Sequence, residues 1–204
     1  MVEDDATRIA LKTELLQRVE ALGLQQALFP SNGEPIDEIV RQLESLNPIP
    51  RPLHLNHLSS LLGSWQLVYA SKGTVVTRQL ASIPAFGGTI NIKRVWQSLV
   101  AGGTGKISAS NGAFLDLPLL GECQLRANGV WTWGADEQMA KVTFNSFSMQ
   151  ATKPFGMESW SFPELKIPVL EFLRNEAEWT TSYLDQEIRV GRGATGNLFV
   201  FRRE

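Results

Sequence analysis

The 204-residue sequence contains one cysteine, Cys123, and no Asn-x-Ser/Thr glycosylation site. A single cysteine cannot form an internal disulfide, so we expect a reducing compartment. Lys and Arg number 19 against 21 Asp and Glu, which gives a formal net charge of −2. The chain therefore lacks the excess of positive charge that attracts nucleic-acid backbones, and no nucleic-acid partner is expected.

Long apolar runs are also missing. The longest stretch without a formal charge, Pro52–Ser71, is only about half apolar, whereas a membrane-spanning helix needs about 20 mostly apolar residues. The N-terminus is acidic over Met1–Asp5 and leads into a helical pattern, unlike a secretory signal or an Arg- and Ser-rich transit peptide. We expect that the protein acts where it is made, or that a leader has been removed.

Catalytic and metal-binding residues are scarce. His54 and His57 are the only histidines, and although their spacing suits one metal ion, no third ligand lies beside them. With both histidines next to a proline-rich connector, no Ser-His-Asp or Cys-His arrangement is indicated. Four carboxylates are interpreted as surface charges or as ion-pair partners of Arg189 and Arg192, namely Asp116, Glu122, Asp185 and Glu187. We expect no enzyme activity, no cofactor and no metal.

One glycine motif resembles a nucleotide-binding loop. Gly191–Gly196 fits the pattern G-x-G-x-x-G, but dinucleotide binding needs a following helix and an acidic residue about 20 positions later. Only eight residues follow Gly196, and Leu198–Phe201 has the character of a strand. The motif is therefore interpreted as a hairpin turn.

The two parts of the chain differ in composition. Residues 1–60 carry nine acidic and five basic residues but only one of the eighteen aromatics. Apolar residues at helical spacing predict helices over about 11–22 and 35–46, and the proline-rich segment 47–52 then ends helix formation. We expect residues 1–60 to form a short helical hairpin and connector that pack on a second part, residues 61–204.

From Gly63 onward, apolar and polar residues alternate in short runs typical of β-strands. The alternation predicts two sets of side chains that share a strand face: Trp65, Leu67 and Tyr69, and Trp179, Thr181 and Tyr183. Two segments, 74–86 and 164–175, are expected to interrupt the strands. Turns are predicted at four dipeptides, namely Gly102-Gly103, Asn111-Gly112, Asn128-Gly129 and Trp133-Gly134. Many short strands with little helix between them favour an antiparallel sandwich or a closed barrel.

A change of phase marks one strand. Val142 and Phe144 share a face, whereas Phe147 and Met149 follow in the opposite phase. One extra residue restores the alternation, so a β-bulge is predicted at Asn145 or its neighbour Ser146.

Several motifs resemble known families. Gly63-Ser64-Trp65 at the start of the first strand resembles the Gly-x-Trp motif of lipocalins. The run Trp179–Gly193, continued by Gly196–Phe201, closely resembles the C-terminal motif of the plastid-lipid-associated proteins, also called fibrillins. Leu43–Pro48 and Leu61–Ser71 are similar to the front of the same family, and the resemblance covers about residues 8–203.

The resemblance implies a mainly β fold, a lipocalin-like antiparallel barrel preceded by helices. It also implies non-catalytic binding or organisation of apolar small molecules such as lipids, carotenoids or isoprenoid quinones, with peripheral membrane association. The expected location is the cytoplasmic face of the thylakoid or the cytoplasm of a cyanobacterium, or a plastid if the source is a plant or an alga.

Seven side chains are the candidate ligand contacts: Trp65, Leu67, Tyr69, Phe144, Trp179, Thr181 and Tyr183. Aromatic walls with a few hydroxyls suit an apolar chain with one polar end, and the same residues suit a filled core equally well. Six positions are interpreted as structural parts of the motifs: Gly63, Asp185, Arg189, Arg192, Gly193 and Gly196. Alternatively, Trp65 is expected to form a cation–π contact with Arg189 or Arg192 that closes the floor of the barrel. Asp185 is expected to order a turn between strands.

Two other functions stay open. The first is an interaction scaffold whose packed barrel and amphipathic front recruit a membrane or an enzyme of isoprenoid metabolism. The second is a lipocalin-like enzyme such as a bilin lyase, which no motif favours.

Overall fold

The computed structural model describes residues 2–31, 34–72, 90–118, 121–135, 137–154, 161–167 and 176–204. Within these ranges the helices are α1 (Val2–Leu28), α2 (Glu34–Ser45) and α3 (Leu58–Leu61). The strands are β1 (Gly63–Ala70), β2 (Asn91–Ala101), β3 (Lys106–Leu117), β4 (Gly121–Trp133), β5 (Met139–Lys153), β6 (Leu165–Ile167), β7 (Ala177–Leu184), β8 (Ile188–Gly193) and β9 (Leu198–Arg203). Helices therefore precede a mainly β remainder, as the sequence predicts.

The strands form one antiparallel sheet that closes on itself. Going round the ring, the order is β1, β2, β3, β4, β5, β7, β8 and β9, and β9 pairs with β1 again. The short strand β6 lies outside the ring and pairs with β5. The mainly β, barrel-like fold expected from the sequence is confirmed, and the sandwich alternative is not observed.

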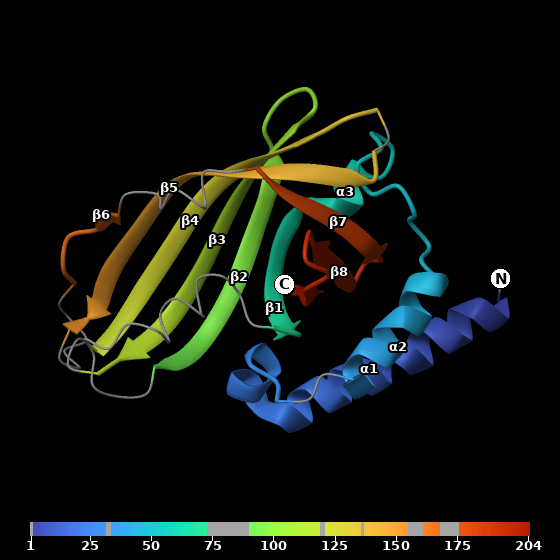
Figure 1. Cartoon of the computed structure of the whole chain (residues 1–204), viewed down its shortest axis with the longest axis horizontal. Coiled ribbons are helices and arrows are strands. Elements are labelled where there is room, and N and C mark those ends of the chain that lie inside the picture. The colour runs from blue at the N-terminus through green and yellow to red at the C-terminus, as the bar shows by residue number, and fades with distance from the viewer. Residues whose placement is uncertain are drawn as a thin grey trace.

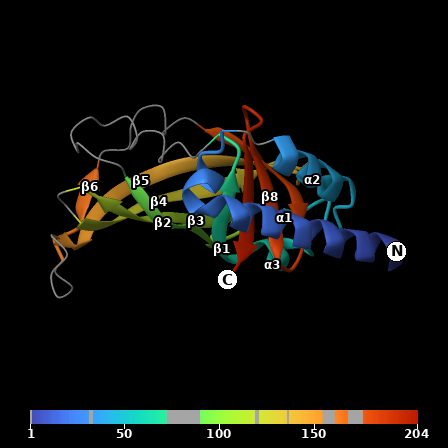
Figure 2. The same ribbon diagram turned by 90° about the horizontal axis from the view of Figure 1, so that it is seen from below.

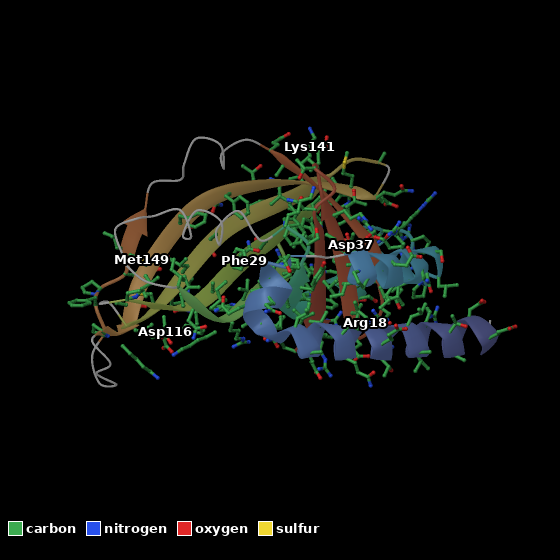
Figure 3. All side chains as sticks on the ribbon, turned by 60° about the horizontal axis from the view of Figure 1, so that its bottom comes forward. Arg18, Phe29, Asp37, Asp116, Lys141 and Met149 are labelled. Atoms are coloured by element: carbon green, nitrogen blue, oxygen red, sulfur yellow. The ribbon has the colours of Figure 1, made fainter. Side chains whose placement is uncertain are left out.

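The ring is closed more tightly at one end than at the other. Strand β1 pairs with β2 only over Gly63–Gln66, and β5 pairs with β7 only over Met139–Val142. Figure 1 shows the consequence, because β2–β5 continue as long curved strands well beyond β7 and β8. Figure 3 places Asp116 and Met149 at the far end of these long strands, away from Asp37 on α2.

The bulge predicted in β5 is confirmed. Asn128 lies opposite Ser146 and Gly129 lies opposite Phe144, so Asn145 is the extra residue. Two of the four predicted turns are also present, since Gly102-Gly103 and Trp133-Gly134 lie in hydrogen-bonded turns between strands.

The other two predicted turns are wrong, because both dipeptides lie inside long strands. Gly112 is in the middle of β3, where a Cβ atom would lie 2.1 Å from the Trp96 ring. Gly129 is inside β4, where a Cβ atom would lie 2.5 Å from the carbonyl oxygen of Thr143. These glycines provide room for a close neighbour, a role that glycine also has in strands.

The N-terminal helices cover one outer face of the ring (Figure 2). Helix α2 has the predicted bounds within a residue, and α1 is interrupted at Gly23, where φ is 70°, before it continues to Leu28. The apolar faces of α1 and α2 pack on outward-pointing residues of β1, β7, β8 and β9, forming one buried cluster. Its members include Leu15, Val19, Val40, Leu43, Tyr69, Tyr183, Ile188, Val190, Leu198 and Val200.

Asn47 links the proline-rich connector to β7 of the barrel through hydrogen bonds. The Asn47 amide donates to the carbonyl of Ser182 at 2.9 Å and accepts from the backbone N–H of Leu184 at 3.1 Å. Further on, α3 lies at the more tightly closed end of the ring, where Trp65 Nε1 donates to the carbonyl of Leu61 at 2.9 Å.

Two expectations fall largely beyond the described residues. The predicted interruption at 74–86 lies entirely outside them, and of the segment 164–175 only 164–167 is described, where β6 forms. Across the described ranges, none of the helices combines the length and apolar character needed to cross a bilayer.

Candidate functional site: an aromatic cavity inside the ring

The ring holds a partly open cavity of about 350 Å³, near the lower end of the range of about 300–1,000 Å³ typical of small-molecule sites. Its lining is mostly apolar. The aromatic residues that β2, β4, β5, β7 and β9 contribute are Trp96, Trp131, Phe144, Phe147, Trp179, Phe199 and Phe201. Trp179 lies at the centre of this group, with ring centroids 5.8 Å from Trp131, 5.3 Å from Phe199 and 6.2 Å from Phe201.

Three of the seven candidate ligand contacts line this cavity: Leu67, Phe144 and Trp179. Thr181 is buried beside it and its hydroxyl accepts a hydrogen bond from Trp179 Nε1 at 3.3 Å. Trp65 is fully buried in the same interior cluster but is not part of the cavity wall. The structure thus brings these five residues together on the inside of the ring.

The expected alternation fails for both tyrosines. Opposite β9, Leu67 pairs with Phe201 and Tyr69 pairs with Val200, so Val68 is an extra residue. In β7, Thr181 pairs with Gly191 and Tyr183 pairs with Val190, so Ser182 is extra. Each bulge moves the tyrosine to the outer face, where both belong to the cluster under the helices. Tyr69 and Tyr183 are therefore not positioned as ligand contacts inside the ring.

Outside the ring, each tyrosine hydroxyl donates to a carboxylate. Tyr69 donates to Asp37 of α2 at 3.3 Å, and Tyr183 donates to Asp185 at 2.8 Å. Burial, together with the neighbouring carboxylate, raises the pKa of both tyrosines. Both phenols therefore stay protonated and act as hydrogen-bond donors that help to fix the helices on the sheet.

Asp185 orders the turn between β7 and β8, as expected. It accepts hydrogen bonds from the backbone N–H groups of Glu187 at 2.8 Å and Ile188 at 2.7 Å. Lys12 of α1 forms an ion pair with Asp185 at 2.8 Å and reaches Glu187 at 3.3 Å. Burial opposes ionisation of Asp185, but the hydrogen bonds from Lys12 and the two N–H groups outweigh it and lower its pKa.

Of the two interpretations of the four carboxylates, the surface charge holds for Asp116 and Glu187, whose side chains are 40% and 42% exposed. The ion pairs to Arg189 and Arg192 are not found for any of the four among the described residues. Asp185 and Glu187 pair with Lys12, as described above, whereas Asp116 and Glu122 pair with Lys93 at 2.9 and 3.1 Å. Arg192 instead points outward to α2, where Nε and Nη2 donate to the two oxygens of Glu44 at 2.7 and 2.8 Å.

Arg189 lies inside the ring and closes its floor. Its guanidinium carbon is 5.0 Å from the Trp65 ring centroid and 4.2 Å from that of Phe201, which confirms the cation–π contact expected between Trp65 and an arginine. Arg203 stacks on Trp65 as well, at 4.0 Å, and donates to the carbonyls of Ser60 and Leu62 beside α3. Burial, with the positive charge of Arg203, lowers the pKa of Arg189 to about 9, so the guanidinium stays charged at neutral pH.

A polar chain that the sequence reasoning missed runs from this arginine along the cavity wall. Arg189 donates to the side-chain oxygen of Gln97 at 2.5 Å, and the Gln97 amide donates to Asn111 at 2.7 Å. Asn111 in turn donates to the carbonyl of Ala127 at 3.3 Å. Gln97 and Asn111 both line the cavity. Since they lie opposite each other on neighbouring strands, only the pairing register, which the sequence does not reveal, brings them together.

The C-terminal glycine motif forms the β8–β9 hairpin, as predicted. Gly196 has a φ of 74° in the turn and donates from its N–H to the carbonyl of Gly193 at 2.8 Å. Gly191 has a different task, because a Cβ atom there would lie 1.8 Å from the Trp179 ring. Gly63, with a φ of 122°, leaves space for the Arg203 guanidinium.

The two histidines lie near each other at the surface, with ring centroids 5.7 Å apart. The Glu137 carboxylate lies 4.0 Å from His54. Among the residues that the structure describes, no three His, Cys, Asp or Glu side chains gather as a metal site would require.

A closed antiparallel ring with an apolar, aromatic cavity defines the class of small β-barrels that enclose a ligand-sized space, to which lipocalins belong. Comparison with protein families then identifies the chain more narrowly. It belongs to the PAP_fibrillin family, whose model matches residues 10–202. The family resemblance found in the sequence is thereby confirmed.

The curated relatives are plant proteins. The chain is 28% identical over 237 residues to the "Light-induced protein, chloroplastic" of Solanum tuberosum, covering 100% of this chain and 72% of the relative. It is 25% identical over 202 residues to the "Probable plastid-lipid-associated protein 8, chloroplastic" of Arabidopsis thaliana, covering 95% of this chain and 71% of the relative. No solved structure gives a significant match.

Proposed function

We propose that this protein binds an apolar small molecule inside the ring and that the role is one of binding or organisation without catalysis. The observation that carries the proposal is the cavity of about 350 Å³, whose described lining includes seven aromatic residues. An apolar wall favours transfer of a lipid chain out of water by about 25 cal/mol for each Å² buried. The size suits a single acyl or isoprenoid chain, so lipids, isoprenoid quinones and carotenoid end groups are the candidate ligands.

We further propose a plastid or photosynthetic membrane as the setting, with peripheral association at thylakoids or lipid droplets. Support comes from the family and from the relatives, which are named as chloroplastic and, in one case, plastid-lipid-associated. Within the chain, residues 1–60 serve as a cover for the barrel of residues 61–204, because the apolar faces of α1 and α2 are buried on the strands.

The scaffold alternative requires a filled barrel and free amphipathic helices. The cavity and the buried faces of α1 and α2 both favour the binding role instead. An interaction surface elsewhere on the molecule would not conflict with it.

Mass spectrometry of organic extracts from the purified native protein tests the proposal, with stoichiometric lipid or pigment as the expected result. A matched pair of variants makes the test specific. Phe144→Ser removes an aromatic ring from the cavity wall and should reduce lipid uptake, whereas Phe162→Ser changes a surface residue that is 43% exposed and should not. Repeated extracts without stoichiometric lipid, or equal uptake by the two variants, would contradict the proposal.

A further inference from the structure

Behind Gln97 of the cavity wall lies a positive charge, Arg189, for which the described residues provide no counter-charge. Arg189 is 0% exposed, and among the described residues no carboxylate lies within salt-bridge distance of its guanidinium. Among the described residues, Nη2 alone has a hydrogen-bond acceptor, and Nε and Nη1 are buried without a partner. Buried charges in proteins are normally paired with an opposite charge, so the aromatic rings around Arg189 offset only part of this cost.

The orientation of the polar chain follows from this charge. Arginine can only donate hydrogen bonds, so the Gln97 oxygen faces Arg189 and its nitrogen faces the Asn111 oxygen. The Asn111 nitrogen then faces the carbonyl of Ala127. Each amide nitrogen carries two hydrogens and uses one in the chain, so Gln97 and Asn111 each keep one N–H that can donate at the cavity wall.

Another donor lies in the same region. Trp131 Nε1 is buried without an acceptor, and its ring centroid is 5.8 Å from the Arg189 guanidinium carbon. In the described part of the cavity lining, Asn197 Oδ1 in the β8–β9 turn is a buried acceptor without a partner. Asn197 lies opposite Gly193 in the hairpin. This pair is four residue pairs away from the pair of Arg189 and Phe201, a distance of about 13 Å along the strands. Donors and positive charge are thus concentrated at the floor.

We infer that the cavity selects a ligand with a carboxylate at its inner end, a long-chain fatty acid, whose oxygens accept the free N–H groups of Gln97 and Asn111. Arg189 supplies the charge behind Gln97 and acts as a positioning residue, because it fixes the direction of both amides. The apolar chain lies along Trp179 and Phe144 toward the β8–β9 turn. This inference rests on the proposed function and specifies the chemical class of its ligand.

The test compares cis-parinaric acid, a fluorescent C18 fatty acid, with its methyl ester at pH 8, where the acid is ionised. Charge-assisted hydrogen bonds are stronger than neutral ones, and a difference of 1.4 kcal/mol corresponds to a factor of ten. We expect the wild-type protein to bind the acid at least about tenfold more tightly than the ester.

The variant Gln97→Glu places a carboxylate beside Arg189 and supplies the missing counter-charge within the protein. The preference for the acid should then disappear, because the variant loses the Gln97 N–H donor and its carboxylate repels that of the ligand. Gln66→Glu is the matched control, since Gln66 lies on β1 outside the cavity lining and pairs in register with Arg202. It should keep the wild-type ratio.

Equal binding of acid and ester by the wild type, or tighter binding of the ester, would overturn the inference and leave the proposed function standing. Binding of neither probe would overturn both. A preference for the acid that persists unchanged in Gln97→Glu would also refute it. If Gln97→Glu fails to fold, the ratio of acid to ester measured on the wild type still decides.

Discussion

Replacing Gly191 by alanine tests how tightly the cavity wall is packed. A Cβ atom at this position would lie 1.8 Å from Cζ2 of Trp179 and within 2.6 Å of two further ring atoms, whereas carbon atoms in contact are about 3.5–4.0 Å apart. The indole must therefore move by nearly 2 Å or the strands must separate. Overpacking of this kind costs about 1–3 kcal/mol, and we expect the upper part of that range because Trp179 also contacts Trp131 and Phe199.

Gly193→Ala is the matched control on the same strand. There a Cβ atom would meet only Phe199, at 3.8 Å, which is ordinary contact. Its unfolding free energy should stay within about 0.5 kcal/mol of the wild type, because alanine also restricts the unfolded chain.

Urea denaturation followed by circular dichroism measures both variants. For a chain of this size, a loss of about 2–3 kcal/mol lowers the melting temperature by roughly 5–10 °C. Adding Trp179→Leu to Gly191→Ala should recover part of the loss, since the two side chains compete for one space. Equal stability of the two alanine variants would refute the packing argument.

Three further predictions concern the helices and their attachment to the ring. Leu43→Ala, at a fully buried position of α2, should cost about 2–5 kcal/mol in urea unfolding, and a loss below 1 kcal/mol would show that the helix is not packed as described. A double-mutant cycle on Glu44 and Arg192, which are partly exposed, should give a coupling energy of about 1 kcal/mol or less, and no coupling at low salt would contradict the bidentate contact. The lowered pKa of Asp185 means that its ionised form stabilises the fold above its unfolded pKa of about 3.9, and that this contribution is lost as the pH falls through the folded pKa. The stability difference between the wild type and Asp185→Asn should therefore narrow below about pH 4, and a difference that is constant with pH would refute the assignment.

The architecture was largely predictable because its main signals are local. Helical spacing in the front part, two-residue alternation after Gly63 and the change of phase near Asn145 each depend on residues close together in sequence. The hairpin at Gly191–Gly196 was predictable for the same reason. The C-terminal motif gave the family, which the match over residues 10–202 confirms.

The errors arise where a residue's role depends on a partner strand. Gly112 and Gly129 look like turn residues in the sequence, but they serve to accommodate Trp96 and the Thr143 carbonyl on neighbouring strands. The direction of Tyr69 could not be predicted either, because the bulge at Val68 appears only in the pairing with β9. Similarly, Gln97 is an unremarkable polar residue until the fold brings Arg189, 92 positions later, to its side chain.

Because Val68 and Ser182 are extra residues in β1 and β7, the face to which the following side chains point depends on the number of residues in each strand as well as on their type. In each strand, alternate side chains before the extra residue point into the ring, whereas the tyrosine that follows it packs under the helices and the last residue, Ala70 or Leu184, is again in the interior cluster. Deletion of Val68 or Ser182 would move each following side chain to the opposite face of the sheet. The tyrosine would then point into the cavity, and the next residue, Ala70 or Leu184, would point outward under α1 and α2. The barrel can thus tolerate a change of side chain at Val68 or Ser182 far better than the loss of the residue itself.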